Sequence, residues 1–284
     1  AAHGCLNLHG IISVKLQNFR SELLALLTFG PEDAAVPDIW EEFDRIFQRL
    51  HGLLHYQPVF MDYYHDAFRT LLEDNVQYVE LRAGIGRLHD LSGGEWTPEQ
   101  SVALLEEIRG RVRKENADFD LKLILAYYRE ADVAAVWDNL QQAVKLRAKY
   151  PDFVIGYDLV GEEDTGHSTF FYLDDWLKLR GLLEEQSTDL PFYFHDGESD
   201  WPGDRNLYDA YLLKSRRIGH GFALFRTPQL EKAVIEAGIA LEVCPISNQV
   251  LRYVRDLRMH PAAGFLNRGV PCVISSDDPA ILGT

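Results

Sequence analysis

Short apolar segments alternate with longer amphipathic segments along most of this chain, from residue 76 onward. The apolar segments are nearly continuous runs of Val, Ile, Leu, Phe and Tyr, as expected of parallel strands that helices cover on both faces. They are Val76–Arg82, Leu121–Tyr127, Val154–Val160, Phe192–His195, Arg217–Phe222, Ile239–Cys244 and Val270–Ser275. The segments between them show helical periodicity and are Pro98–Glu115, Ala131–Tyr150, Leu173–Glu185, Asn206–Ser215 and Thr227–Glu236. This alternation predicts an α/β fold of βα units, which in its closed form is a TIM (β/α)8-type barrel.

Both ends of the expected barrel are incomplete. Residues 1–14 offer only an irregular or truncated first strand, and the chain ends soon after Asp278. Ahead of the first clear apolar segment, Ile39–Leu54 and Met61–Glu73 have the pattern of amphipathic helices. We therefore expect residues 1–284 to form one barrel domain that is incomplete at the first strand and after the eighth strand.

Three of the apolar segments end in ionisable side chains. One leads into His195-Asp-Gly-Glu198, a second ends at Gly219-His220-Gly221, and the last ends at Asp277-Asp278. The carboxyl ends of barrel strands share one rim, so these side chains should lie around one site. Two adjacent buried carboxylates repel each other unless a cation lies there or one of them keeps a proton.

This set of side chains predicts a metal-assisted hydrolase. His195 and Asp277 are the expected metal ligands, since imidazole and carboxylate groups both bind Zn²⁺. Glu198 is close enough along the chain to carry a proton to or from the reacting group. His220 would polarise water or stabilise developing charge, and Asp278 would orient the attacking water.

Each motif alone also has an ordinary structural interpretation. A single histidine after a strand is most often a hydrogen-bonded structural residue, and Gly219-His220-Gly221 by itself indicates nothing more specific. Asp277-Asp278-Pro279 could simply start a helix, with an aspartate as its N-cap. These interpretations become improbable together, because the motifs follow separate strands of one expected sheet.

Composition narrows the class of partner. The net charge of −16 argues against nucleic acid and anionic membranes, and a neutral or cationic small molecule fits better. No segment approaches the roughly 20 apolar residues that span a bilayer, and no signal peptide opens the chain.

Five sequence blocks extend these motifs and resemble the adenosine deaminase family of metal-dependent hydrolases. Within that family the similarity is to the secreted, growth-factor-like adenosine deaminase 2 branch. The blocks are Tyr157-Asp-Leu-Val-Gly-Glu-Glu-Asp-Thr-Gly-His167, Phe194-His-Asp-Gly-Glu-Ser-Asp-Trp201, Arg217-Ile-Gly-His-Gly-Phe-Ala-Leu224, Glu242-Val-Cys-Pro-Ile-Ser-Asn-Gln-Val-Leu251 and Val273-Ile-Ser-Ser-Asp-Asp-Pro279. The resemblance covers roughly residues 15–284 and includes the segments Trp40–Phe47 and Glu73–Arg82.

The resemblance implies a TIM barrel with one Zn²⁺ per chain that converts adenosine and 2'-deoxyadenosine to their inosine products and ammonia. It also implies an extracellular location and a homodimer as the assembly to test. The resemblance also implies roles for individual residues, with His195 and Asp277 as zinc ligands. Glu198 would donate a proton to purine N1, His220 would act on the attacking water, and Asp278 would contact that water and the purine. The Gly161 backbone would contact the base, and Trp40 would lie near the nucleoside.

The chain also departs from the family pattern. The family has a His-x-His metal pair on its first strand, whereas the first residues here offer only His3-Gly-Cys5 and His9. The receptor-binding insertion of the branch is missing as well. A catalytically impaired, growth-factor-like paralogue that binds a nucleoside or a receptor is therefore the alternative hypothesis. A third hypothesis is a relative that acts on another amino-purine or on a nucleotide such as AMP, although the negative net charge disfavours a phosphorylated substrate.

Overall fold

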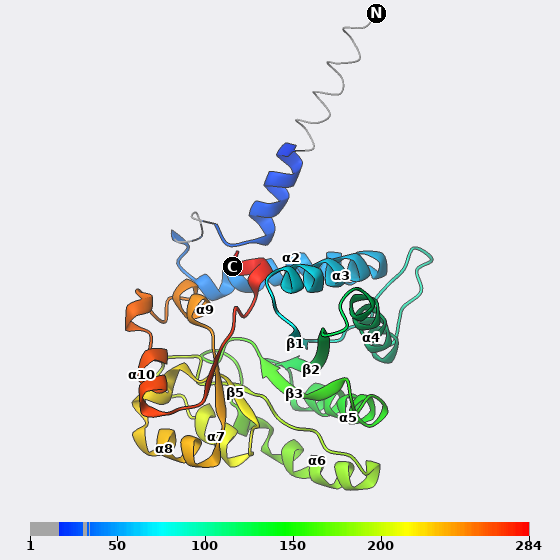
Figure 1. Cartoon of the computed structure of the whole chain (residues 1–284). Coiled ribbons are helices and arrows are strands. Elements are labelled where there is room, and N and C mark those ends of the chain that lie inside the picture. The colour runs from blue at the N-terminus through cyan, green and yellow to red at the C-terminus, as the bar shows by residue number, and fades with distance from the viewer. Residues whose placement is uncertain (1–16, 31–32, 34, 284) are drawn as a thin grey trace, which may run out of the picture.

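Two parallel β-sheets form the centre of the protein (Figure 1). The computed structural model describes residues 17–30, 33 and 35–283. The first sheet contains β1 (Tyr78–Ala83), β2 (Asp120–Tyr128) and β3 (Val154–Val160), in that order. The second contains β4 (His195–Asp196), β5 (Arg217–His220), β6 (Ala240–Val243) and β7 (Cys272–Ile274), in that order. An isolated parallel bridge between Tyr157 and Phe192 connects β3 to the segment before β4.

The seven strands confirm the predicted α/β class, and their arrangement is that of a partial barrel. In the described part of the chain, β1 and β7 are not paired with each other, so the ring of strands is open between them. The expected irregular strand at residues 1–14 lies outside the described residues. The predicted strand at Phe192–His195 is observed later and shorter, because Phe192 contributes only the isolated bridge.

Helices follow most of the strands and cover the outside of the sheets (Figure 1). They are α4 (Pro98–Glu115), α5 (Val133–Lys149), α6 (Leu173–Gln186), α7 (Asn206–Leu212), α8 (Pro228–Ala237), α9 (Pro245–Val250) and α10 (Ala262–Arg268). The start of α4 shows why its bounds could be predicted: Thr97 and Gln100 form a reciprocal capping box, and Pro98 occupies the first turn. Thr227 precedes α8 without capping it, because its hydroxyl donates to the Leu224 carbonyl at 3.2 Å.

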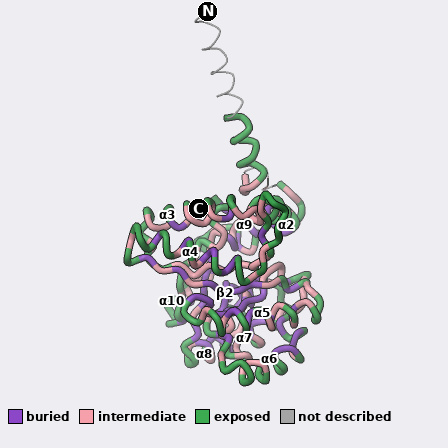
Figure 2. Tube along the Cα trace, turned by 90° about the vertical axis from the view of Figure 1, so that its right-hand side faces the viewer, coloured by how far each residue is buried: buried purple, intermediate pink, exposed green. Residues whose placement is uncertain are grey.

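The apolar core follows the two sheets, with one cluster around each (Figure 2). Helix α4 illustrates the pattern, because its fully buried residues Val102, Leu105, Ile108 and Val112 recur every three or four positions. Burying side chains of this size contributes about 1.5–3 kcal/mol each. This packing fixes the strands and therefore the positions of the residues at their carboxyl ends.

Two N-terminal helices cross one end of the sheets, where the C-terminus also lies (Figure 1). They are α2 (Ile39–Leu54) and α3 (Gln57–Glu73). Trp40 and Phe43 on α2 join an apolar cluster with Ile281 of the short C-terminal helix α11 (Pro279–Leu282). Helix α2 therefore places residues from early in the chain beside the segment that follows β7.

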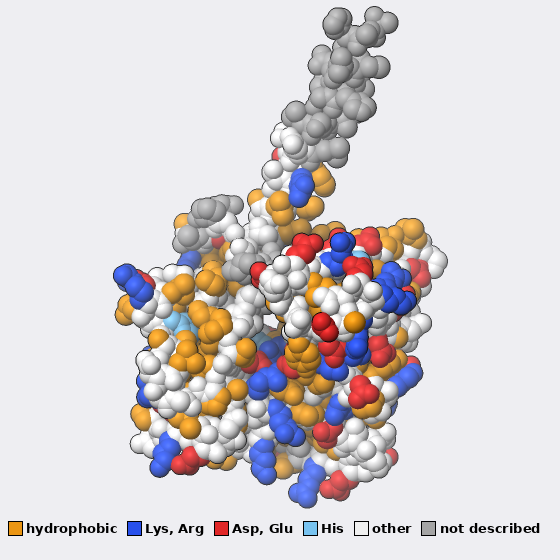
Figure 3. Space-filling view, viewed as in Figure 1, with side chains coloured by type: hydrophobic (Ala, Val, Ile, Leu, Met, Phe, Trp, Pro, Cys, Tyr) orange, Lys and Arg blue, Asp and Glu red, His pale blue; other side chains and the backbone are white. Residues whose placement is uncertain are grey.

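A helix over residues 17–27 projects from this end of the molecule (Figure 1). Phe19, Leu24 and Leu26 on it are more than half exposed, and apolar side chains are visible along it in Figure 3. In the described residues, no helix is both long enough and apolar enough to cross a membrane.

Candidate active site

Three side chains that could ligate a metal converge at the carboxyl ends of the second sheet. His195 begins β4, His220 ends β5, and Asp277 follows β7. Strand register explains the first two positions, because His195 is paired with Gly219, the neighbour of His220. One ligand-type atom from each of His195, His220 and Asp277 lies within 4.8 Å of the others. The sequence motifs at three strand ends are thus brought to one place.

The chemistry of these three groups fits a zinc ion. Two imidazoles and one carboxylate are typical ligands of a catalytic zinc, which keeps a further position for water or substrate. His220 Nε2 lies 3.8 Å from Asp277 Oδ2, and the buried His220 Nδ1 has no hydrogen-bond partner in the described residues. Nearby positively charged residues such as Arg82 are already engaged with other carboxylates.

The backbone is strained at two of these positions. His220 and Asp277 have φ angles of 58° and 61°, in the left-handed region that side chains other than glycine rarely adopt. Such conformations cost roughly 1–3 kcal/mol each and persist where surrounding structure imposes them. The chain therefore turns sharply at both residues and directs their side chains towards the same centre.

Asp158, inside β3, holds the ring of His195. It is fully buried and accepts from His195 Nδ1 at 2.5 Å and from the His195 backbone N–H at 2.8 Å. With Nδ1 carrying the proton, Nε2 is left as the free acceptor of this imidazole. His195 and Arg82 together keep the pKa of Asp158 below its ordinary value despite the burial that raises it.

Arg82 and Arg217 extend this contact into an ionic network across the two sheets. Arg82 on β1 donates to Asp158 at 2.7 Å and is ion-paired with Glu242 on β6. Arg217 on β5 pairs with the same Glu242 and with Glu80 on β1. These charged residues were not predicted as part of the site. Glu242 was the one sequence feature that indicated such a network, because an acid within an apolar strand requires a buried partner.

Glu198 is buried beside the cluster, and among the described residues no lysine or arginine forms an ion pair with it. Its Oε1 lies 3.6 Å from His220 Nδ1, beyond a hydrogen bond. Burial, reinforced by the negative charge of Asp277, raises the pKa of the Glu198 carboxyl well above its ordinary value. Burial also lowers the pKa of His220 to about 4, against the opposing effect of Asp277. Burial therefore favours the protonated form of Glu198 and the neutral form of His220.

Asp278 occupies the N-cap position of α11, but its side chain accepts no capping hydrogen bond. Burial, followed by the neighbouring charge of Asp277, raises the pKa of Asp278 well above its ordinary value. The ordinary interpretation of Asp277-Asp278-Pro279 as a capped helix start therefore leaves this half-buried carboxyl unexplained. It is available to a ligand.

Trp40 and Gly161 lie on two further segments near this end of the sheets. Trp40 Nε1 donates to the Tyr253 hydroxyl at 2.8 Å, and the charge of Glu198 contributes to raising the pKa of Tyr253, after burial. Tyr253 thus contacts Trp40 and is close enough to Glu198 to be affected by its charge. Gly161 has a φ of 109°, and a Cβ there would lie 2.5 Å from Glu130 Oε1. Only glycine suits this position, and its backbone stays uncovered by a side chain of its own.

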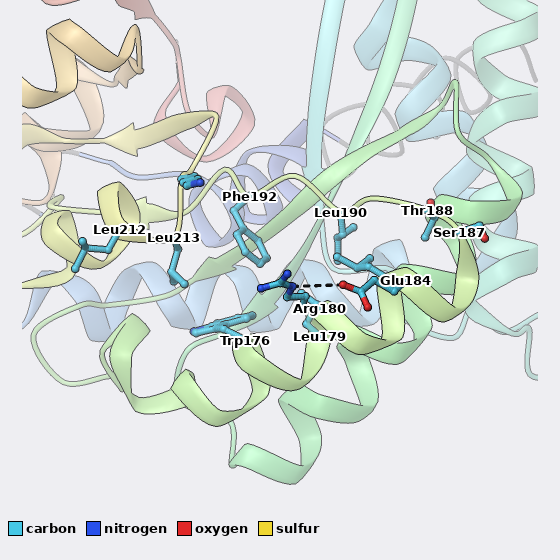
Figure 4. A pocket seen from close by; sticks show the side chains of 12 residues that line it. Trp176, Leu179, Arg180, Glu184, Ser187, Thr188, Leu190, Phe192, Leu212 and Leu213 are labelled. Atoms are coloured by element: carbon cyan, nitrogen blue, oxygen red, sulfur yellow. Dashed lines mark hydrogen bonds and ion pairs between the residues drawn. The ribbon is translucent and has the colours of Figure 1, made fainter.

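A groove of about 510 Å³ lies elsewhere, between α6, the segment before β4 and the end of α7 (Figure 4). Trp176, Leu190 and Phe192 line it, and Arg180 and Glu184 form an ion pair at its side. The groove's lining includes none of the residues predicted for catalysis or metal binding. Its size therefore does not indicate where the chemistry takes place.

Comparison with known proteins agrees with this geometry. A sequence model of the family described as adenosine deaminase matches residues 32–284. Adenosine deaminase 2 of Homo sapiens is 43% identical over 249 residues, which cover 86% of this chain and 48% of that protein. The chain spans about half the length of the curated relatives it matches.

Solved structures with low sequence identity share the fold. The crystal structure of adenine deaminase from Arthrobacter aurescens matches with a TM-score of 0.71 at 20% identity, over 89% of this chain and 72% of that one. An amidohydrolase from Burkholderia ambifaria with bound Zn matches with a TM-score of 0.68 at 18% identity, over 93% of this chain and 68% of that one. Both support the assignment of the open ring of strands as part of a TIM-type barrel.

Proposed function

The chain belongs to the adenosine deaminase family, in its adenosine deaminase 2 branch, and from this premise we propose that it deaminates adenosine and 2'-deoxyadenosine by hydrolysis. In this reaction the oxygen of water forms a bond to purine C6 and the C6–N bond of the amino group breaks. One proton of the water ends on purine N1 and the other on the departing ammonia. The products are inosine or 2'-deoxyinosine and ammonia.

We assign one zinc ion to the cluster, held by His195 and Asp277, with His220 within reach. The donor set supports this assignment, as does the bound Zn of the Burkholderia ambifaria neighbour. Zinc at this position would supply Lewis acidity that makes a water molecule a better nucleophile. Asp158 keeps the His195 ring oriented so that Nε2 faces the cluster.

The protonated Glu198 carboxyl donates its proton to purine N1, which makes C6 more electrophilic. His220, a neutral imidazole near pH 7, accepts a proton from the attacking water. Asp278 contacts that water and the purine. The Gly161 backbone contacts the base, and Trp40, fixed by Tyr253, lies beside the nucleoside.

One observation carries the proposal: Glu198, buried in surroundings that raise its pKa, lies beside three side chains able to hold a metal. The test is to follow the loss of adenosine absorbance with the purified protein, before and after zinc is removed by a chelator and then restored. We expect zinc-dependent turnover and one zinc per chain by elemental analysis. A folded, zinc-loaded protein without turnover would reject the proposal and favour the impaired, growth-factor-like paralogue.

The substrate class and setting are part of the same proposal. Adenosine should be preferred to AMP, because a net charge of −16 disfavours phosphate. Comparing the two substrates in the same assay tests this preference. Membership in the adenosine deaminase 2 branch supports a secreted protein and a homodimer, and size-exclusion chromatography with light scattering tests the dimer.

A further inference from the structure

A second buried acid, Glu163, accepts hydrogen bonds from the turn that contains Glu198. Its Oε1 accepts from the Gly197 N–H at 2.8 Å, and its Oε2 accepts from the Ser199 N–H at 2.9 Å. These two amides lie immediately before and after Glu198 in the chain. One carboxylate therefore fixes the backbone on both sides of the proposed proton donor.

The rest of the turn is held as firmly. Gly197 has a φ of 75°, and a Cβ at this position would lie 2.4 Å from the Leu207 side chain. The Gly197 carbonyl accepts from the Ala223 N–H at 2.8 Å. The turn thus packs against neighbouring segments and cannot relax freely if one anchor is lost.

Glu163 is itself fixed in the fold. It is 7% exposed, and its Oε1 also accepts from Asn206 Nδ2 at 2.9 Å. Asn206 in turn accepts from the backbone N–H of Thr169 at 2.9 Å. The segments after β3, before α6 and at the start of α7 therefore meet at this carboxylate, which explains how a residue on another strand end can set the geometry of the β4 turn.

We propose that Glu163 is a positioning residue that fixes where Glu198 presents its proton, by accepting hydrogen bonds from the amides on either side of it. The inference rests on the proposed deaminase function. Glu163 itself touches neither the substrate nor the metal cluster. Its hydrogen bonds act through the backbone of residues 197–199, and its negative charge also contributes to raising the pKa of Glu198, after burial and Asp277.

The isosteric substitution Glu163→Gln tests this role. Because it also removes a negative charge that contributes to the raised pKa of Glu198, exchange of the Ser199 amide is measured to separate the positioning effect from the charge effect. All three partners of Glu163 are N–H donors, so an amide cannot satisfy them as a carboxylate does. If the Gln oxygen keeps the hydrogen bonds from Gly197 and Asn206, the Gln NH₂ group faces the Ser199 N–H, and both groups are donors. The side-chain volume is unchanged, and one anchor of the turn is replaced by two opposed donors.

Glu162→Gln is the matched control, since it is the same change one residue earlier. Glu162 is partly exposed and accepts from the Thr165 hydroxyl at 2.6 Å, a bond that Gln can also accept. For Glu163→Gln we expect kcat for adenosine to fall about 10- to 100-fold, the effect of misplacing a catalytic group by a fraction of its hydrogen-bond length. KM should change less than about threefold, because substrate contacts are intact, and Glu162→Gln should match the unsubstituted protein in both constants.

Amide hydrogen exchange supplies a readout that does not depend on activity. The Gly197 and Ser199 amides of the unsubstituted protein should be protected, and Glu163→Gln should speed exchange at Ser199 about tenfold. Unprotected amides in the unsubstituted protein would overturn the inference without any variant, even if Glu163→Gln fails to fold. Equal kcat for Glu163→Gln and Glu162→Gln would also overturn it.

The two proposals fail in different ways. If the unsubstituted, zinc-loaded protein does not deaminate adenosine, the proposed function is wrong and the catalytic part of this inference falls with it, while hydrogen exchange still decides whether Glu163 anchors the turn. If that protein is active and Glu163→Gln keeps its kcat, only the role of Glu163 is rejected.

Discussion

Replacing Asp158 with Asn should weaken zinc binding more than any other change outside the metal cluster. Asp158 Oδ2 accepts from both His195 Nδ1 and Arg82 Nε, at 2.5 and 2.7 Å. An Asn NH₂ group there would face two donors, while its oxygen could keep the His195 backbone N–H. His195 would then no longer be held with its proton on Nδ1, and Nε2 would be protonated and unable to ligate in part of the population.

The size of this effect follows from the contacts. Loss of the hydrogen-bond partner of a metal-binding histidine typically lowers metal affinity about 10- to 100-fold. Breaking a buried ion pair, here with Arg82, costs about 3–5 kcal/mol of unfolding free energy. Glu242→Gln is the matched control, since it weakens the other ion pair of Arg82 without touching His195. Both variants should lose stability in urea unfolding of the zinc-free protein, but only Asp158→Asn should lose zinc affinity by the full factor.

Competition with a chromophoric zinc chelator measures the affinity directly. Zinc dissociation constants that agree within about twofold for Asp158→Asn and Glu242→Gln would refute the reasoning, because 100-fold corresponds to about 2.7 kcal/mol and is well resolved by such an assay. It would mean that Asp158 stabilises the fold without orienting His195.

Three further outcomes are expected. Glu198→Gln should lower kcat for adenosine about 10²- to 10⁴-fold in steady-state assays while the zinc content stays unchanged, since the amide cannot donate the proton at N1; a zinc loss or an unchanged kcat would contradict the assignment. Asp204→Asn should stabilise the protein more at pH 8 than at pH 5 in urea unfolding, because burial and the charge of Glu163 raise the pKa of Asp204 to about 7. Its proton is kept by the folded state and released by the unfolded state between about pH 4 and 7, so wild-type stability falls as pH rises through that window and Asn removes the loss. An equal difference at both pH values would show that Asp204 ionises normally. Trp40→Phe should raise KM for adenosine about 2- to 10-fold with little change in kcat, because it removes the hydrogen bond to Tyr253; an unaltered KM would place Trp40 outside the nucleoside site.

Local chemistry explains which elements could be predicted from the sequence. Helix α4 was predicted with its observed bounds because the residues that determine its start, Thr97, Pro98 and Gln100, are close together in the sequence. Strand β3 was predicted with its observed bounds because its residues are mostly apolar, with Asp158 as the one charged exception. Side-chain hydrogen bonds are less predictable: Thr227 occupies the N-cap position of α8, but its hydroxyl donates to the Leu224 carbonyl.

In the candidate site, too, some residues could be predicted from the sequence and others could not. The residues at strand ends could be predicted, because the carboxyl ends of parallel strands must share one rim. Asp158 and Glu163 could not be assigned their contacts, because each acts across strands on a residue more than 30 positions away. Sequence indicates that a buried acid needs partners but does not say which donors the fold delivers.

The buried ionic network ties the site to the assembly of the barrel. Each sheet has its own apolar cluster, and in the described residues the strand pairing between the two sheets is limited to an isolated bridge between Tyr157 and Phe192. The pairs that Arg82 and Arg217 form with Glu242 and Glu80 therefore connect strands of both sheets. Since Arg82 also contacts Asp158, a shift between the sheets would be transmitted to the ring of His195. In this arrangement Asp158 holds the metal-binding histidine directly, whereas the Glu242 pairs act on it only through Arg82, so loss of Glu242 should lower stability and should lower zinc affinity less than loss of Asp158 does.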